Sequence, residues 1–130
     1  MSVQRGQSFN QVLLEVIDDS LVVLGEEPRK AVYQYLMTLH SLEREKIPEK
    51  TEEFVSGLKK ALGAASSVIE RLILKKLYQR LGSVFHESQG LEFGDYVNDA
   101  RRRFEVLKQH QSGYNDTVDS IRSKKGQFSG

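Results

Sequence analysis

Apolar side chains recur at steps of three and four residues along most of the chain, a spacing that places them on one face of an α-helix. Ser8 precedes the first such repeat as a candidate N-cap, and Gly25 follows it as a stop. We therefore predict a first helix between these two residues. Its expected buried positions are Phe9, Val12, Leu13, Val16, Ile17, Leu21 and Leu24.

The pattern resumes in the segment EEPRKAVYQYLMTLHSL, which predicts a second helix. Pro28 stands near its first position, where a missing N–H is harmless. Glu26 and Glu27 suit the positive end of the helix dipole. Tyr33 falls beside the apolar stripe and is expected to be exposed. The expected buried positions are Ala31, Val32, Tyr35, Leu36 and Leu39.

A charged run around Ile47 and Pro48 separates the second helix from the third. Proline disfavours α-helical geometry in the residue before it, so Ile47 is expected to be extended and to anchor the loop in the core. Thr51 is a candidate N-cap for a third helix that ends at Gly63. Its expected buried positions are Phe54, Val55, Leu58, Ala61 and Leu62.

The fourth predicted helix, residues 64–81, is the most apolar one. Its stripe covers more than half the circumference, which implies contacts on two sides. We expect it to be the central helix of a bundle or, in part, a dimer surface. The stripe contains Ala65, Val68, Ile69, Leu72, Ile73, Leu77 and Leu81, and Leu74 and Tyr78 widen it.

A fifth helix is predicted from about Phe93 to His110, after a connector in which Val84 and Phe85 are expected to extend the core. Its apolar side carries Phe93, Tyr96, Val97, Ala100, Phe104 and Leu107. Polar residues and glycine dominate from Ser112 onward, so residues 111–130 are predicted to form a flexible basic tail, with a transient helical turn near residues 118–121.

Together these patterns predict an all-α fold: a compact bundle of four helices with a longer C-terminal fifth helix and a flexible tail. Residues 1–110 would form a single domain. The core positions that we expect with most support are Val16, Val32, Leu36, Phe54, Leu58, Ile69, Leu72, Ile73 and Leu77.

Charge is unevenly distributed along the 130 residues. The net charge of +1 divides into +4 over residues 101–130 and −3 over the first hundred. The absence of cysteine excludes disulfides and thiolate chemistry. No segment has the length and apolarity of a membrane span or a signal peptide, so a cytoplasmic location is expected.

Residues with catalytic or metal-binding spacing are missing from the sequence. His40, His86 and His110 lie on different predicted segments and form no His-x-x-x-His pair. No glycine-rich phosphate loop is present. We therefore predict no catalytic residue, no metal and no cofactor, and no small-molecule substrate is evident. The sequence leaves open a ligand pocket between the helices.

A nucleic-acid role rests on the basic residues near the C-terminus. Such a cluster can neutralise several phosphates without reading sequence. The alternative is that the arginines pair with Asp95, Asp99 and Glu105 along their own helix. The helix-turn-helix geometry is disfavoured over residues 51–82 because the second helix is too apolar. The candidate phosphate contacts are Arg101, Arg102, Arg103, Lys108, Lys124 and Lys125.

Residues 10–82 resemble the Nitrosopumilus-type output domains of archaeal signal-transduction proteins, a match that covers a little over half of the chain. It is carried by Leu24-Gly25, Tyr33, Tyr35, Leu36, Ile47-Pro48, Phe54, Leu58, Leu62-Gly63, Ile69-Glu70 and Leu81-Gly82. The resemblance implies a cytoplasmic, non-catalytic helical module that acts through protein contacts.

The sequence thus supports two hypotheses. The first is a non-enzymatic interaction or output module in archaeal-type signalling that binds a protein partner, a second copy of itself as a homodimer, or both, with Tyr33, Leu74 and Tyr78 as candidate partner contacts. The alternative is a nucleic-acid-binding accessory protein that uses the basic C-terminal region.

Overall fold

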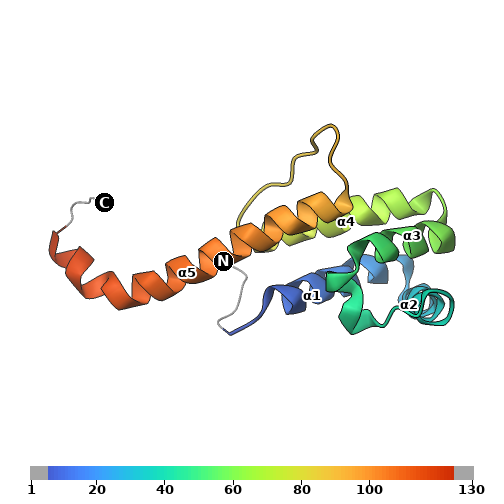
Figure 1. Ribbon diagram of the computed structural model, residues 1–130, viewed down its shortest axis with the longest axis horizontal. Coiled ribbons are helices and arrows are strands. Elements are labelled where there is room, and N and C mark those ends of the chain that lie inside the picture. Colours follow the sequence, from blue (N-terminus) through green and yellow to red (C-terminus); the bar gives the residue numbers. More distant parts are fainter. Residues whose placement is uncertain (1–5, 125–130) are drawn as a thin grey trace.

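The computed structural model describes the backbone of residues 6–124 and the side chains of residues 6–109. Within this range every regular element is a helix, which confirms the predicted all-α class (Figure 1). The elements are α1 Phe9–Leu21, the 3₁₀ helix η1 Val22–Leu24, α2 Glu26–His40, the 3₁₀ helix η2 Arg44–Glu49, α3 Thr51–Leu62, α4 Ala65–Arg80 and α5 Phe93–Lys124.

Helix boundaries follow local capping chemistry. The Ser8 hydroxyl accepts a hydrogen bond from the Gln11 N–H at 3.1 Å, and the Gln11 side chain accepts one from the Ser8 N–H at 2.7 Å, which confirms Ser8 as the N-cap of α1. Gly25 lies at φ +111°, a conformation that favours glycine, between η1 and α2. Thr51 was the wrong N-cap for α3: it is the first helical residue, and Lys50 occupies the cap without a side-chain hydrogen bond.

Ile47 is fully buried, as predicted, but the prediction that it is extended is wrong. Ile47 and Pro48 belong to η2, where the Lys46 N–H donates to the Glu43 carbonyl at 2.9 Å and the Lys50 N–H to the Ile47 carbonyl at 3.0 Å. Each of these hydrogen bonds joins residues three apart, and neither needs an N–H from Pro48. The proline is therefore accommodated in a short 3₁₀ segment.

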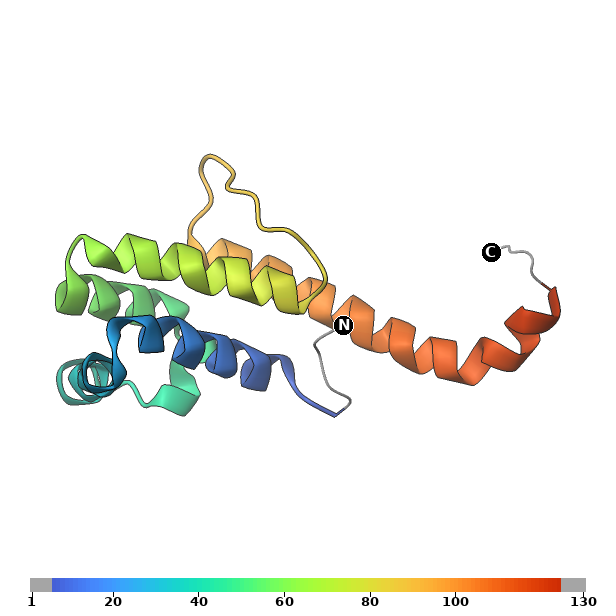
Figure 2. The same ribbon diagram turned by 180° about the vertical axis from the view of Figure 1, so that it is seen from behind.

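Helix α4 packs against α1, α3 and α5, and α5 runs alongside it in both views (Figures 1 and 2). Its buried side comprises Ser66, Ile69, Ile73, Leu74, Leu77 and Tyr78, so the broad stripe does make contacts on more than one side. Eight of the nine best-supported core positions are buried, whereas Leu72 is only partly buried.

Several predicted core positions are exposed because the apolar stripes are wider than the contacts that the helices make. Helix α2 buries only Val32 and Leu36, and Leu39 is 63% exposed. The corrected positions are Ala31 and Leu39 on α2, Ala65 and Val68 on α4, and Val84 in the connector, all exposed.

Helix α5 packs on the bundle through its predicted apolar face, with Leu107 half-buried at the edge. It continues to Lys124, so the prediction that it ends near His110 is wrong. Low helix propensity disfavours each residue by less than about 1 kcal/mol, which is too little to define an end. In both views the last part of α5 extends past the other helices (Figures 1 and 2). The division into a domain of residues 1–110 and a tail of residues 111–130 stays a prediction.

Candidate functional site

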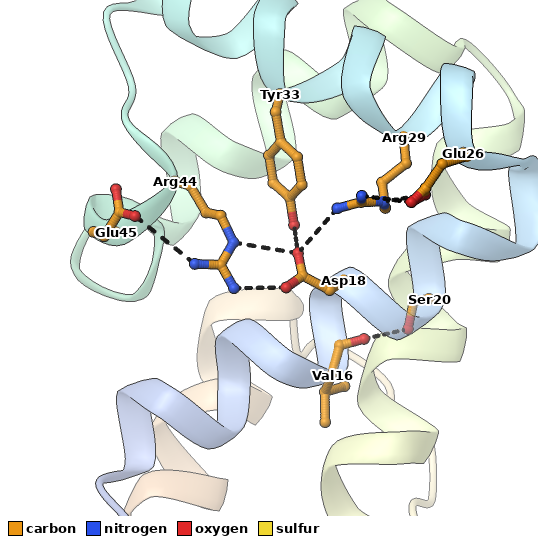
Figure 3. Close-up of polar contacts among 8 residues, drawn as sticks. All are labelled: Val16, Asp18, Ser20, Glu26, Arg29, Tyr33, Arg44 and Glu45. Carbon is orange, nitrogen blue, oxygen red and sulfur yellow. Dashed lines mark hydrogen bonds and ion pairs between the residues drawn. The ribbon is translucent and has the colours of Figure 1, made fainter.

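Tyr33, predicted to be an exposed contact, instead belongs to a polar cluster centred on Asp18 (Figure 3). The Tyr33 hydroxyl donates a short hydrogen bond to Asp18 Oδ1. Arg44 donates from Nη2 to Asp18 Oδ2 at 2.6 Å and from Nε to Oδ1 at 3.2 Å, and Arg29 Nη1 lies 3.8 Å from Oδ1. One carboxylate therefore joins α1, α2 and η2.

The charges in this cluster favour a structural role. Burial and the hydrogen bond to Asp18 raise the pKa of Tyr33 well above its ordinary value, so the phenol stays protonated. Partial burial raises the pKa of Asp18, but the hydrogen bonds from Arg44 and Tyr33 and the charges of Arg44 and Arg29 outweigh it, and the net pKa is lowered. Both groups are moved away from the pKa range that proton transfer near neutral pH requires.

The other two predicted partner contacts, Leu74 and Tyr78, are each only 4% exposed. The Tyr78 hydroxyl lies 2.6 Å from Asp99 Oδ2 and 3.2 Å from the Tyr96 carbonyl oxygen, which ties α4 to α5. Burial and the bond to Asp99 raise the pKa of Tyr78. The use of these residues as contacts stays a prediction, and more exposed apolar surface lies elsewhere.

Arg101 is occupied by contacts within the chain. Its guanidinium donates to Asn10 Oδ1 at 3.0 Å and to the Pro48 carbonyl at 3.1 Å, and it lies 4.7 Å from the centre of the Phe9 ring. These contacts join α5 to α1 and η2. Arg101 is therefore a structural residue and a poor candidate for a phosphate contact.

Arg102 and Arg103 share the carboxylate of Asp99, at 3.6 and 2.8 Å, which confirms one of the helix pairings considered from sequence. Their side chains remain 72% and 51% exposed. Lys108 is exposed, with its Nζ 5.8 Å from the centre of the Phe104 ring. Lys124 is the last residue of α5, its side chain outside the described part of the chain, and Lys125 lies outside the described residues altogether.

A shallow apolar hollow of about 370 Å³ lies where α5 leaves the bundle. Leu81, Val106 and Leu107 form its apolar surface, and Val106 is 65% exposed. Ser83, Arg102 and Arg103 complete the lining. Within this hollow Leu107 packs against the core, whereas Val106 of α5 leaves most of its surface uncovered by the described residues.

A larger cleft of about 860 Å³ lies between α3, α4 and the connector of residues 81–92. One wall is a face of α3 with residues spaced four apart, and the second is a face of α4. The connector and the start of α5 form the third wall. The lining residues are Thr51, Glu52, Val55, Ser56 and Lys59 of α3, Ser67, Glu70, Arg71 and Leu74 of α4, and Phe85, Glu87, Ser88, Gln89, Leu91, Glu92, Phe93, Gly94 and Tyr96.

The connector that walls this cleft is attached to the bundle at several points. Arg71 donates to Glu87 at 3.1 Å. The Tyr96 hydroxyl accepts from the Ser88 N–H at 2.7 Å and donates to the Ser88 carbonyl at 3.0 Å. The Phe85 ring packs against the Tyr96 ring, with centres 5.0 Å apart. The third wall thus has a defined position, although the exposed ion pair contributes little energy.

Glu70 is the carboxylate of this cleft whose pKa is raised by its surroundings. Burial raises its pKa, and the charge of Lys59 across the cleft opposes that rise only in part. Among the described side chains it forms no hydrogen bond or ion pair. A partly buried carboxylate without a partner favours binding of a cationic group.

The cleft was not predicted from the sequence. The available signal was the series Thr51, Val55 and Lys59, a second stripe on α3 beside the core stripe. Nothing in the sequence places that stripe opposite Glu70 of α4, because the opposition depends on how the helices pack.

Within residues 6–109, no group of three or more His, Asp or Glu side chains is arranged to hold a metal ion. None of the helices described has both the length and the apolar character required to cross a bilayer. No family model, no curated protein and no solved structure matches the chain. The resemblance of residues 10–82 to the archaeal output domains therefore stays a prediction.

Proposed function

We propose that this chain, a four-helix bundle with a longer fifth helix, is a non-enzymatic interaction module that associates with a second copy of itself through α5. The observation that carries the proposal is the length of α5, which has 32 residues and extends beyond the other helices (Figures 1 and 2). A helix segment without tertiary contacts is marginal in water, so the extended part favours a partner.

The sequence of α5 has the spacing of a coiled coil. Phe93, Val97, Ala100, Phe104 and Leu107 alternate in steps of four and three, and all but Leu107 are buried against the bundle. The same steps continue in the sequence at Gln111, Tyr114, Val118 and Ile121. Beyond the positions buried against the bundle, the seven-residue repeat from Leu107 to Ile121 continues for about two heptads with the spacing of a coiled coil.

A second copy is favoured because the repeat is self-complementary. In a parallel pair of helices each seam residue contacts the same residue of the second copy. A polar residue in the apolar seam, such as Gln111, favours the register in which the two copies of that residue are paired. Leu107, the first of these seam positions, also lines the apolar hollow. Arg103 and Lys108 would flank the seam from opposite chains, so added salt should strengthen the dimer by screening their repulsion.

The titratable groups support a non-catalytic role. The pKa values of Asp18 and Asp99 are lowered and those of Tyr33 and Tyr78 are raised, so these paired groups keep one charge state near neutral pH. The resemblance to archaeal output domains adds signalling as the cellular context. A receiver or kinase gene beside this one would support that context.

Light scattering after size exclusion tests the proposal on the full chain. The mass measured by light scattering should be twice the 14.8 kDa of one chain. Val118→Asp should give the mass of a monomer, because it places a charge in the seam. Ser120→Asp, which adds the same charge two residues away and off the seam, should remain a dimer. A wild-type monomer at high concentration, or equal behaviour of the two variants, would count against the proposal.

Nucleic-acid binding is the second candidate, favoured by the exposure of Arg102 and Arg103. Retention of labelled DNA at low salt, lost on deletion of residues 111–130, would support it. Salt separates the two candidates, because phosphate binding weakens with added salt whereas the proposed dimer tightens.

A further inference from the structure

We propose that the cleft between α3, α4 and the connector of residues 81–92 binds a short peptide segment that presents a lysine or arginine beside an apolar side chain. Only the start of α5 lines the cleft, and the proposed dimer seam lies toward the other end of that helix, so the two sites are separate. The inference therefore goes beyond the proposed function and does not depend on it.

The inner surface of the cleft is suited to an apolar side chain. Val55 of α3 and Phe85 of the connector are partly exposed and line it from two walls. Leu91 lies in the third wall and is 48% exposed. Covering such surface contributes about 25 cal/mol for each Å² removed from water, which favours an apolar occupant here.

The charges of the cleft favour a cationic occupant. Four glutamates and two basic residues line it, which leaves an excess of two negative charges. Arg71 is already bound to Glu87, so it does not neutralise the remaining glutamates. Glu70 lies partly buried without a hydrogen bond from the described side chains, and a lysine or arginine of the occupant would supply one.

The dimensions favour a peptide segment. The α3 wall runs from Thr51 to Lys59, a distance of about 12 Å at 1.5 Å per residue. An extended chain rises about 3.3 Å per residue, so this wall matches about four residues. Such a segment can place an apolar side chain against Leu91 and a cationic one beside Glu70 at the same time.

The test uses the full isotope-labelled chain and two capped peptides, Ala-Leu-Lys-Leu-Ala and Ala-Leu-Glu-Leu-Ala, followed by amide NMR shifts. The lysine peptide should move the amides of Val55, Glu70 and Ser88, and the glutamate peptide should not. Glu70→Gln should weaken binding of the lysine peptide about tenfold, the value of a charge-assisted hydrogen bond. Glu105→Gln, an exposed position outside the cleft, is the matched control and should leave binding unchanged.

Three results would overturn the proposal: shifts that map away from the cleft, equal binding of the two peptides, or unchanged affinity in Glu70→Gln. Equal shifts with butylamine alone would also overturn it, because the site would then take a small amine. If Glu70→Gln lowers the folded fraction, the pH dependence of peptide binding by the wild-type chain tests the same point. Its affinity for the lysine peptide should fall as pH is lowered through the raised pKa of Glu70. Neither the amide shifts nor the peptide affinity depends on dimerisation. A negative result for the cleft would therefore not count against the proposed dimer.

Discussion

Substitution of Asp18 by asparagine tests whether the cluster in Figure 3 holds the bundle together. The change keeps the size of the side chain but removes the charge that Arg44, Tyr33 and Arg29 share. We expect the free energy of unfolding to fall at neutral pH. Asp19→Asn is the matched control, because Asp19 is the next residue on α1 and is exposed.

The size of the effect follows from the contacts of Asp18. Hydrogen bonds to a charged group contribute about 1.5–3 kcal/mol, whereas an exposed ion pair contributes less than about 1 kcal/mol. The Asp18 side chain is 30% exposed, between these cases, and asparagine can still accept one or two of the hydrogen bonds. We therefore expect a loss of about 2 kcal/mol, and less than about 0.5 kcal/mol for the control.

Urea unfolding followed by circular dichroism gives both values, and repeating it over pH tests the cause. The pKa of Asp18 is lowered in the folded chain, so its stabilisation is complete above the ordinary value of 3.8 and is lost as pH falls through the lowered pKa. The difference between the wild type and Asp18→Asn should therefore shrink in acid. Equal losses for Asp18→Asn and Asp19→Asn at pH 7, or a difference that grows in acid, would refute the reasoning.

Three further substitutions have defined outcomes. Gly57→Ala should lower stability by up to about 2 kcal/mol in urea unfolding, because its new Cβ would overlap Leu36 Cδ2 of a fully buried side chain, a cost that exceeds the gain of about 1 kcal/mol from alanine in a helix. Ser8→Ala should cost about 1 kcal/mol by removing the cap of α1, and Ser8→Asp should restore it in the same assay. Tyr78→Phe should cost about 1–2 kcal/mol in thermal unfolding, because Asp99 loses its hydroxyl donor.

The positions of the helices could be predicted because their signals are local. Ser8 caps α1 through its own neighbour Gln11, and Gly25 and Gly63 stand where helices end or begin. The predicted backbone conformation was wrong where two local rules compete. Pro48 excludes an α-helix at Ile47 but permits a 3₁₀ turn, which the sequence pattern does not separate from an extended loop.

The exposure of individual side chains could not be predicted in the same way. Tyr33 and Leu39 stand on the same helix, and the expected order was reversed: Tyr33 is half-buried against Asp18, and Leu39 is 63% exposed. A helical repeat gives the angle between two side chains around the axis. It does not give the direction from which the next helix approaches.

The sequence alone therefore determined the all-α class, most helix boundaries and the apolar faces, because hydrogen bonds within a helix and its caps join residues at most six apart in the chain. Tertiary structure decided which polar groups meet. Asp18 faces Tyr33 and Arg44, and Glu70 faces Lys59 across a cleft, only because separate helices are packed together. Such contacts join residues that are distant in the chain, and a single sequence carries no spacing that specifies them.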